Sequence, residues 1–148
     1  MGEADEAGAS YDIRPTRVEV IHLDTGFLIK SLVRGSAEDR SLRDWLKAGE
    51  VVAMSAVAWA ELLCGPLEAS HLELISLVVS EHTPFGEEDA VLAARLFNES
   101  GRRRGSLMDC MIAASALRAG APLATTNARD FRRFSAAGLT LLEGRRNR

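Results

Sequence analysis

Short apolar runs alternate with longer helical runs between residues 18 and 142, and this alternation constrains the fold more than any other feature of the sequence. Residues 51–54 (VVAM) are uniformly apolar, which is typical of a strand buried on both faces of a parallel sheet. Further strands are expected at 18–23, 82–85, 123–126 and 139–142. Because strands that alternate with helices need right-handed crossovers, the sequence predicts an α/β fold, with a mostly parallel central sheet flanked by helices on both faces.

Helix start and stop signals lie between these runs. Ser36, Ser55 and Ser106 are placed to cap helices with their side-chain oxygens, and Gly49 and Gly120 follow two helix ends. Helices are expected over about 25–33, 36–49, 55–65, 68–80, 87–101, 106–120 and 128–135. We predict one domain over residues 18–148. Residues 1–17, which are rich in Gly, Ala and acidic side chains, are predicted to form a disordered acidic tail.

The composition suits one globular domain, with 148 residues, 47% of them hydrophobic and 26% charged. No apolar run approaches the roughly 20 residues of a membrane helix, and the N-terminus lacks the basic and apolar segments of a secretory signal. Cys64 and Cys110 lie singly in apolar runs, so we expect two buried thiols rather than a disulfide or a zinc site. The chain is expected to be soluble and cytoplasmic.

The formal net charge of −3 conceals an uneven distribution. Residues 1–101 carry 8 Lys and Arg against 18 Asp and Glu, whereas residues 102–148 carry 10 Arg against 3 acidic residues. The arginines of this second part include 102–104, Arg129, Arg132 and Arg133, which are candidate contacts to phosphate. Arginine-rich helix ends that only face solvent are an equally ordinary explanation. The charge is compatible with a nucleic-acid partner without establishing one.

Two acidic residues stand alone in apolar segments of the first half of the chain. Asp24 directly follows the first predicted strand, where it either caps the next helix or faces a ligand at the end of the strand. Glu61 is the one charged residue of SAVAWAELLCG (55–65). A carboxylate among apolar side chains needs a partner or a cation, unless its tip reaches water at the rim of the fold.

The second half contains two further acids in comparable places. Asp109 is the only charge in GSLMDCMIAASAL (105–117), and with Ser106 it also resembles a helix capping pair. Asp130 follows the fourth predicted strand in the polar segment NARDF, where Asn127 offers the same capping alternative. For each acid separately, a structural role remains a reasonable explanation, although Glu61 is the stronger signal of a functional one.

Taken together, the four acids indicate a metal site. Elements that leave parallel strands meet at one edge of the sheet, so Asp24, Glu61, Asp109 and Asp130 are expected to converge there. Carboxylates a few Å apart repel one another by about 1 to 4 kcal/mol per pair, which a divalent cation relieves. Oxygen ligands favour Mg²⁺ or Mn²⁺ over zinc. A metal bound in this way can activate water against a phosphodiester.

Four segments also resemble a known family in their order and spacing. They are HLDTGFLI, MSAVAWAELLCG, LMDCMIAASALRAGAPLATTNARDF and GLTLL. Together they resemble the PIN-domain nucleases, and most of all the VapC-type toxins of bacterial toxin–antitoxin pairs. The resemblance extends from about residue 18 to residue 142.

The resemblance carries expectations about fold, activity and partners. It implies a PIN-like α/β/α sandwich, and an Mg²⁺- or Mn²⁺-dependent endoribonuclease that hydrolyses RNA phosphodiesters. By motif, the metal ligands and catalytic residues would be Asp24, Glu61, Asp109 and Asp130. It further implies a homodimer that a cognate antitoxin protein inhibits.

Two other classes of function remain open at this point. In a non-catalytic PIN-like module, the carboxylates would be helix caps and charges at the rim of the fold. Trp45 and Trp59 would either face a groove for a partner protein or belong to the core. A receiver or phosphatase-like domain with Asp24 as nucleophile lacks the usual second Asp two positions on. His22, His71 and His82 show no spacing typical of metal ligands or of a nucleophile and its base, and no phosphate-binding glycine loop is present.

Overall fold

A computed structural model describes residues 19–103 and 106–145. Within these ranges the strands form one sheet in the order β3-β2-β1-β4-β5, and every neighbouring pair is parallel. The strands are β1 (Val20–Leu23), β2 (Val51–Ser55), β3 (Glu81–Thr83), β4 (Leu123–Ala124) and β5 (Leu141–Leu142). The predicted parallel sheet is confirmed, and the tail predicted at 1–17 lies outside the described residues.

Helices connect the strands at the places that the sequence predicted. They are α1 (Thr25–Ser31), α2 (Ala37–Lys47), α3 (Ala56–Cys64), α4 (Ala69–Val78), α5 (Glu87–Glu99), α6 (Leu107–Arg118), α7 (Ala128–Phe131) and the 3-10 helix η1 (Arg132–Ala137). The helix predicted at 128–135 is therefore divided between α7 and η1. The third strand ends at Thr83, before the predicted end, because Pro84 has no backbone N–H with which to continue the ladder. In the described part of the chain, no helix combines the length and apolarity that crossing a membrane requires.

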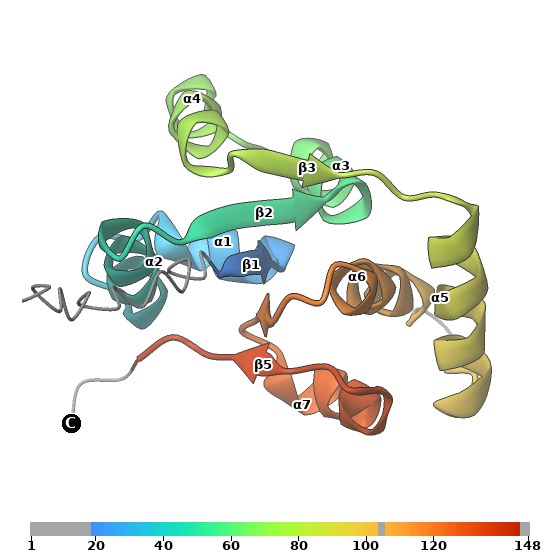
Figure 1. The fold of residues 1–148 in the computed structure, drawn as a ribbon. Helices are drawn as coiled ribbons and strands as arrows, with labels where there is room; N and C mark the ends of the chain where they lie inside the picture. Colours follow the sequence, from blue (N-terminus) through green and yellow to red (C-terminus); the bar gives the residue numbers. More distant parts are fainter. Residues whose placement is uncertain (1–18, 104–105, 146–148) are drawn as a thin grey trace, which may run out of the picture.

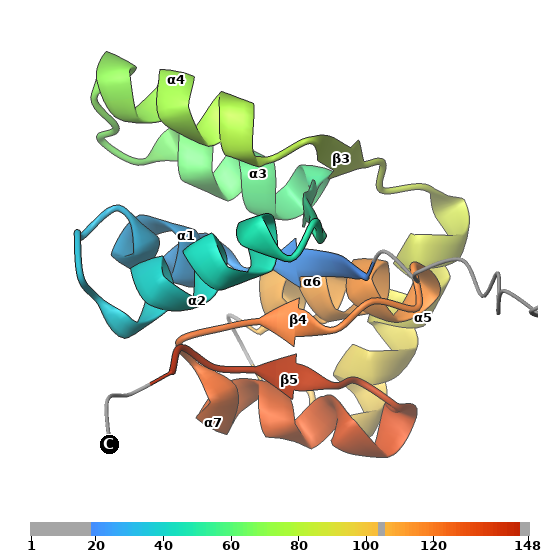
Figure 2. The ribbon, with the colours of Figure 1, turned by 60° about the vertical axis from the view of Figure 1, so that its left-hand side comes forward.

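The helices cover both faces of the sheet. In two views, α1 and α2 lie together on one side of the strands, and α5 and α6 lie on the other (Figures 1 and 2). Large side chains fill the space between these layers and are almost fully buried; they include Phe27, Met54, Ile112, Leu123 and Phe131. The predicted α/β/α arrangement is thus confirmed.

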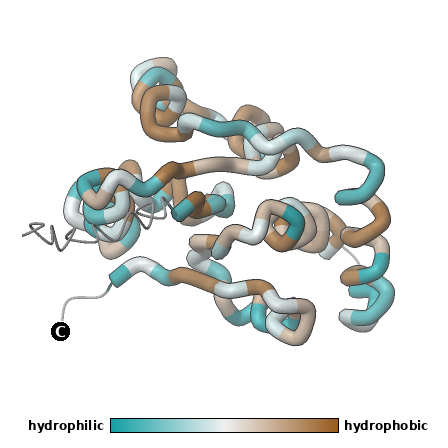
Figure 3. The backbone as a smooth tube through the Cα atoms, viewed as in Figure 1, coloured by the Kyte–Doolittle hydropathy of each residue, from teal (hydrophilic) through white to brown (hydrophobic). Residues whose placement is uncertain are grey.

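The hydropathy of the chain broadly follows this layering (Figure 3), although several helices, α4 most clearly, also expose hydrophobic side chains. Helix α5 alternates hydrophobic and hydrophilic residues, and its apolar Ala93 and Leu96 are buried. In α4 the hydrophobic side chains are not all covered, since Leu74 is 51% exposed and Leu77 is 82% exposed. Helix α4 therefore presents an apolar surface that the described chain leaves open.

The two cysteines differ from each other in their surroundings. Cys110 is buried in α6, as predicted, whereas Cys64 is exposed. The prediction of a buried Cys64 was wrong because this residue is the last of α3, at an exposed end of the helix next to the exposed Gly65.

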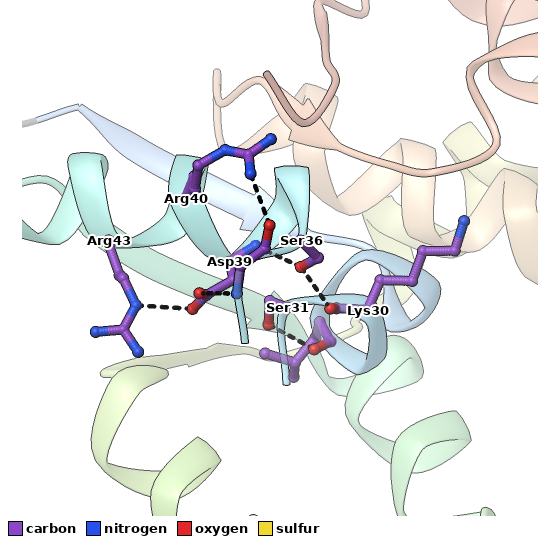
Figure 4. Close-up of polar contacts among 8 residues, drawn as sticks. Lys30, Ser31, Ser36, Asp39, Arg40 and Arg43 are labelled. Atoms are coloured by element: carbon purple, nitrogen blue, oxygen red, sulfur yellow. Dashed lines mark hydrogen bonds and ion pairs between the residues drawn. The ribbon is translucent and has the colours of Figure 1, made fainter. Parts of the chain in front are cut away.

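The turn between α1 and α2 is fixed by hydrogen bonds around Asp39 (Figure 4). Ser36 Oγ accepts from the Asp39 N–H at 3.0 Å, so the predicted cap of α2 is confirmed. The Asp39 carboxylate in turn accepts from the Gly35 N–H at 2.9 Å and from Arg43 Nε at 2.8 Å. The Gly35 bond and the neighbouring arginine hold the pKa of Asp39 below its usual value. These contacts fix the start of α2, and Ser36 Oγ also donates to the Lys30 carbonyl of α1 at 2.9 Å, which joins the two helices.

The direction of chain growth reverses beside the central strand β1. The chain adds β2 and β3 on one side of β1 and then crosses to add β4 and β5 on the other. In open α/β sheets, ligands bind outside the carboxyl ends of the strands at such a point. Leu23 is the last residue of β1, so Asp24 occupies this place, and its N–H donates to the Ala124 carbonyl at 2.9 Å.

Candidate active site

The acids that the sequence singled out lie on elements that begin or end at the carboxyl edge of the sheet. Asp24 follows β1, and Glu61 lies on α3, the helix that leaves β2. Asp109 lies in the first turn of α6, which runs towards the start of β4, and Asp130 lies on α7, which follows β4. Helices that return a parallel chain begin at this edge, which is why acids far apart in sequence lie on the same side of the sheet.

Asp24 is buried, being only 8% exposed, and its carboxylate accepts a hydrogen bond from a residue far away in the sequence. Thr125 Oγ1 donates a hydrogen bond of 3.0 Å to Asp24 Oδ2, and Thr125 itself is fully buried. Burial raises the pKa of Asp24 to about 6, and the charges of Glu61 and Asp109 add to the increase, while hydrogen bonds from Thr125 and the Thr25 backbone oppose it. Asp24 makes no side-chain capping bond to α1, so the capping alternative does not account for it.

Glu61 is half-buried on α3, and two hydrogen bonds fix this helix near Asp24. Ser55 Oγ accepts from the Ala58 N–H at 3.1 Å, so the predicted cap of α3 is confirmed. Thr25 Oγ1 donates to the Ala58 carbonyl at 3.0 Å, which ties the start of α1 to α3. The charge of Glu61 raises the pKa of both Asp24 and Asp109, so its carboxylate acts on both positions.

Asp109 is the third residue of α6, and its pKa is raised chiefly by burial. The charges of Asp130 and Glu61 raise it further, whereas Arg133 and Arg103 lower it. The predicted capping pair with Ser106 is wrong. Ser106 has a helical backbone conformation, and its hydroxyl donates to the Arg103 carbonyl at 2.6 Å instead of capping α6.

Asp130 has a local partner and a different electrostatic environment. Asn127 Nδ2 donates to Asp130 Oδ2 at 2.9 Å, and this bond is the main reason why the pKa of Asp130 lies below its ordinary value. The Asn127 N–H donates to Thr125 Oγ1 at 2.9 Å. A chain of hydrogen bonds thus runs from Asp24 through Thr125 and Asn127 to Asp130.

One arginine lies against this group of acids. Arg133 Nη2 is 3.6 Å from Asp109 Oδ2, and only 15% of the Arg133 side chain is exposed. The neighbouring Arg132 and Arg129 are exposed, and Arg104 lies outside the described residues. Among the arginines proposed as phosphate contacts that lie in the described ranges, Arg133 is the one that forms an ion pair with the acids.

The arrangement suits a hydrated hard cation better than a cation enclosed by protein ligands. Over residues 19–103 and 106–145, no three His, Cys, Asp or Glu side chains lie close enough together to hold a metal ion. The charges of Glu61 and Asp109 act on Asp24, and those of Asp130 and Glu61 act on Asp109. These groups offer only oxygen ligands, and the pKa of the buried Asp24 is raised. Mg²⁺ keeps several waters and needs only one or two protein carboxylates. One or two of these carboxylates are therefore the candidate protein ligands of such an ion, and water would have to complete its coordination.

Comparison with known proteins identifies the family. The model of the PIN domain matches residues 21–137, which is most of the chain. The chain belongs to the PIN domain family. The sequence has no match among curated proteins.

Several solved structures resemble this PIN domain. The VapBC2 complex of Rickettsia felis bound to a promoter DNA fragment has a TM-score of 0.68 and 20% identity over 84% of this chain and 98% of that chain. A toxin–antitoxin complex from Klebsiella pneumoniae has a TM-score of 0.65 and 21% identity, covering 86% and 99%. VapBC-5 of Mycobacterium tuberculosis has a TM-score of 0.57 and 25% identity, covering 86% and 98%. The expected PIN-like fold is confirmed by these similarities.

Two residues of the PIN site were not recognised from the sequence. Thr125 is one of two adjacent threonines in LATTN, and nothing in the sequence shows that its hydroxyl reaches Asp24. Asn127 was considered only as a helix cap, whereas its side chain holds Asp130. The only sequence signal was their position directly after a strand at the edge where ligands collect.

Proposed function

We propose that this PIN domain is a metal-dependent endoribonuclease and the toxin of a toxin–antitoxin pair. The observation that carries the proposal is the buried Asp24 carboxylate at the carboxyl end of β1, beside which the direction of chain growth reverses. The pKa of Asp24 is raised to about 6 by burial and by the neighbouring charges of Glu61 and Asp109. Strongly perturbed carboxyl groups at such a position are typical of functional sites. Membership in the PIN family supports hydrolysis of a phosphodiester as the reaction class.

The side chains have separate roles in this proposal. Asp24 and Asp109 would hold Mg²⁺ or Mn²⁺, with Glu61 and Asp130 as further ligands directly or through water. When bound, such an ion lowers the pKa of a coordinated water and offsets charge on the phosphate group. Thr125 keeps the Asp24 carboxylate oriented, and Asn127 does the same for Asp130. No covalent intermediate with the protein is required.

The test is cleavage of a labelled single-stranded RNA in the presence of Mg²⁺ or Mn²⁺. The variants are Asp24→Asn and Asp109→Asn, and the matched control is Asp44→Asn, which removes one exposed carboxylate from α2. We expect each site variant to lose at least 100-fold of the wild-type rate and the control to keep it. EDTA should abolish activity in all of the active proteins.

The same assay tests the non-catalytic alternative. That alternative is supported by the absence, in the described ranges, of three potential ligands close enough to enclose an ion. Equal rates for the wild type, Asp24→Asn and Asp109→Asn would favour a module that only binds another protein. In that case, Asp24 would be a buried acid without a chemical role.

For the antitoxin, we propose a groove between α1, α2 and α4 as the binding site. This groove has a volume of about 150 Å³, and its lining is mostly apolar: Leu28, Leu32, Leu42, Leu46, Leu74, Ile75 and Val78, with Ser31, Asp39 and Arg43. Figure 4 shows Asp39 and Arg43 on α2 beside this region. Because the similar structures named above are complexes with antitoxins, an antitoxin segment with apolar side chains is the proposed occupant.

Trp45 and Trp59 do not belong to this groove. Trp45 stacks on Phe27 with ring centroids 5.5 Å apart, and Trp59 meets the His82 ring edge-on at 4.3 Å. Both tryptophans pack against the core. Of the two roles considered for them, core packing is therefore the one supported.

The groove is tested by co-purification with a co-expressed cognate antitoxin. Leu74→Glu places a charge on the exposed apolar surface of α4, and we expect it to reduce the recovered antitoxin at least tenfold. Val91→Glu makes the same change at a residue of α5 that is 60% exposed and should leave the complex intact. Equal recovery with both variants would contradict the assignment of the groove.

We also propose that the protein is a homodimer and acts in the cytoplasm, as its resemblance to VapC-type toxins implies. Light scattering of the purified chain measures its mass in solution. A mass of one chain at micromolar concentration would contradict the dimer.

A further inference from the structure

Arg133 is largely buried beside the acids, with 15% of its side chain exposed, although it lies in a polar segment that the sequence presents as surface. It is the second residue of η1, and its guanidinium carbon lies 4.6 Å from the centre of the Phe134 ring. Stacking on an aromatic ring restricts the plane of the guanidinium group. The side chain is thus held in a defined place rather than being free to turn into solvent.

The donors of Arg133 lack acceptors. Its Nε and Nη2 atoms are buried and have no hydrogen-bond partner in the described part of the chain. The nearest carboxylate oxygen, Asp109 Oδ2, is 3.6 Å from Nη2, which is longer than the 2.7–2.9 Å typical of a charge-assisted hydrogen bond. Asp109 therefore supplies countercharge without satisfying the N–H groups.

Buried and unpartnered guanidinium donors are costly, and they are expected to find an acceptor in the working state of the protein. The guanidinium fork fits the oxygens of phosphate in pairs. A phosphodiester that approaches the four carboxylates meets repulsion, and Arg133 is the positive side chain that contacts this group of acids through an ion pair in the described chain.

We propose that Arg133 is a substrate-binding residue that donates from Nε and Nη2 to an oxygen of the RNA backbone. This inference rests on the proposed function, since it takes RNA as the ligand of the acidic site. The phosphate oxygen would supply the acceptor that Asp109 does not. Arg132 and Arg129 are exposed, and Arg103 and Arg129 act on Asp109 or Asp130 only through their charge. In the described chain, Arg133 is the one of these arginines that forms an ion pair with the acids, so the proposal singles it out.

The test is binding of a fluorescent single-stranded RNA oligonucleotide in EDTA, measured by anisotropy, so that neither metal nor cleavage enters. We expect Arg133→Gln to weaken binding at least fivefold. We also expect it to lower the slope of log affinity against log salt by about 0.7, the value for one lost phosphate contact on a single strand. Arg133→Lys should keep most of the salt slope, since it keeps the charge, while losing affinity because it lacks the fork.

The control is Arg95→Gln, which removes the same charge from the exposed surface of α5 and should change affinity less than twofold. Thermal unfolding of each variant verifies that the fold is retained. RNA affinity and salt slope equal to the wild type in a folded Arg133→Gln protein would overturn the proposal. Arg133 would then only balance the charge of Asp109, and direct titration with Mn²⁺ would detect that role as a changed metal affinity.

The outcome is independent of the proposed catalytic activity. Failure of the wild type to cleave RNA with any divalent ion would reject the nuclease, yet the binding experiment in EDTA would still report on Arg133. Conversely, active cleavage with unchanged binding and an unchanged KM in Arg133→Gln would reject only the role of this arginine.

Discussion

Thr125 Oγ1 donates a 3.0 Å hydrogen bond to Asp24 Oδ2, joining two buried side chains that are 101 positions apart in sequence. The same hydroxyl accepts from the Asn127 N–H, so its own proton is directed towards the carboxylate. This contact opposes the effect of burial on Asp24, because it stabilises the charged form.

Replacing Thr125 should therefore make Asp24 harder to ionise. For Thr125→Val, we expect the pKa of Asp24 to rise above about 6 and the free energy of unfolding at pH 8 to fall by about 1–3 kcal/mol, the cost of an unsatisfied buried charge. Urea denaturation at pH 8, with a carboxyl titration by NMR, measures both. Thr125→Ser keeps the hydroxyl and should resemble the wild type; an equal loss in Thr125→Ser would point to packing instead.

Asp24 also makes the stability of the metal-free protein depend on pH. Its folded pKa of about 6 lies above the ordinary value of 3.8, so ionisation costs the folded state more than the unfolded state. The free energy of unfolding is therefore highest, as far as Asp24 determines it, below about pH 4. It falls by about 3 kcal/mol in total as the pH rises through 6. In EDTA, Asp24→Asn should thus gain stability relative to the wild type between pH 4 and pH 8. A constant difference between the two proteins across this range would refute the pKa assignment.

A divalent cation should reverse this penalty. Protons and metal compete for the Asp24 carboxylate, so Mn²⁺ should raise the melting temperature of the wild type clearly at pH 8 and much less at pH 5. The melting temperature is measured at both pH values, without Mn²⁺ and with about 5 mM Mn²⁺. Asp24→Asn should lose the shift, and Asp44→Asn should keep it. A shift of the same size at both pH values would mean that the ion binds elsewhere.

The cap of α3 connects stability with the position of Glu61. Ser55→Ala removes the side-chain acceptor for the Ala58 N–H and should lower the free energy of unfolding by about 1 kcal/mol. We also expect a several-fold lower rate of RNA cleavage, because α3 carries Glu61. Ser76→Ala, in the exposed interior of α4, removes a hydroxyl that bonds only within its own helix and is the control for both measurements. If Ser55→Ala lost stability but cleaved RNA at the wild-type rate, the result would contradict a dependence of the reaction on the position of Glu61.

Much of the fold was predictable because its signals are local. Ser36 and Ser55 each cap the helix that follows them, since a side-chain oxygen one turn before an N–H reaches it without help from the rest of the chain. Ser106 has the same sequence signature but a helical backbone, and its hydroxyl binds the Arg103 carbonyl. The conformation of the preceding segment decides between these outcomes, and the sequence around Ser106 does not reveal it.

The candidate site was predictable in its members but not in its contacts. Solitary acids in apolar segments were sufficient to single out Asp24, Glu61 and Asp109. The partner of Asp24 was not predictable, because Thr125 reaches it only through the pairing of β1 with β4. Arg132 and Arg133 are equivalent in sequence, and only tertiary packing exposes the first and places the second beside Asp109. The assignment of the four acids as metal ligands stays a prediction for the experiments above.

The pairing of β1 with β4 has a consequence for the order of events during synthesis. Asp24 is synthesised 101 residues before Thr125, whose strand and hydroxyl complete its surroundings. An incomplete nascent chain therefore has the first acid but lacks the wall around it. If the proposed cleavage of RNA needs an oriented Asp24 carboxylate, a nascent chain that has not yet added β4 would lack that part of the site.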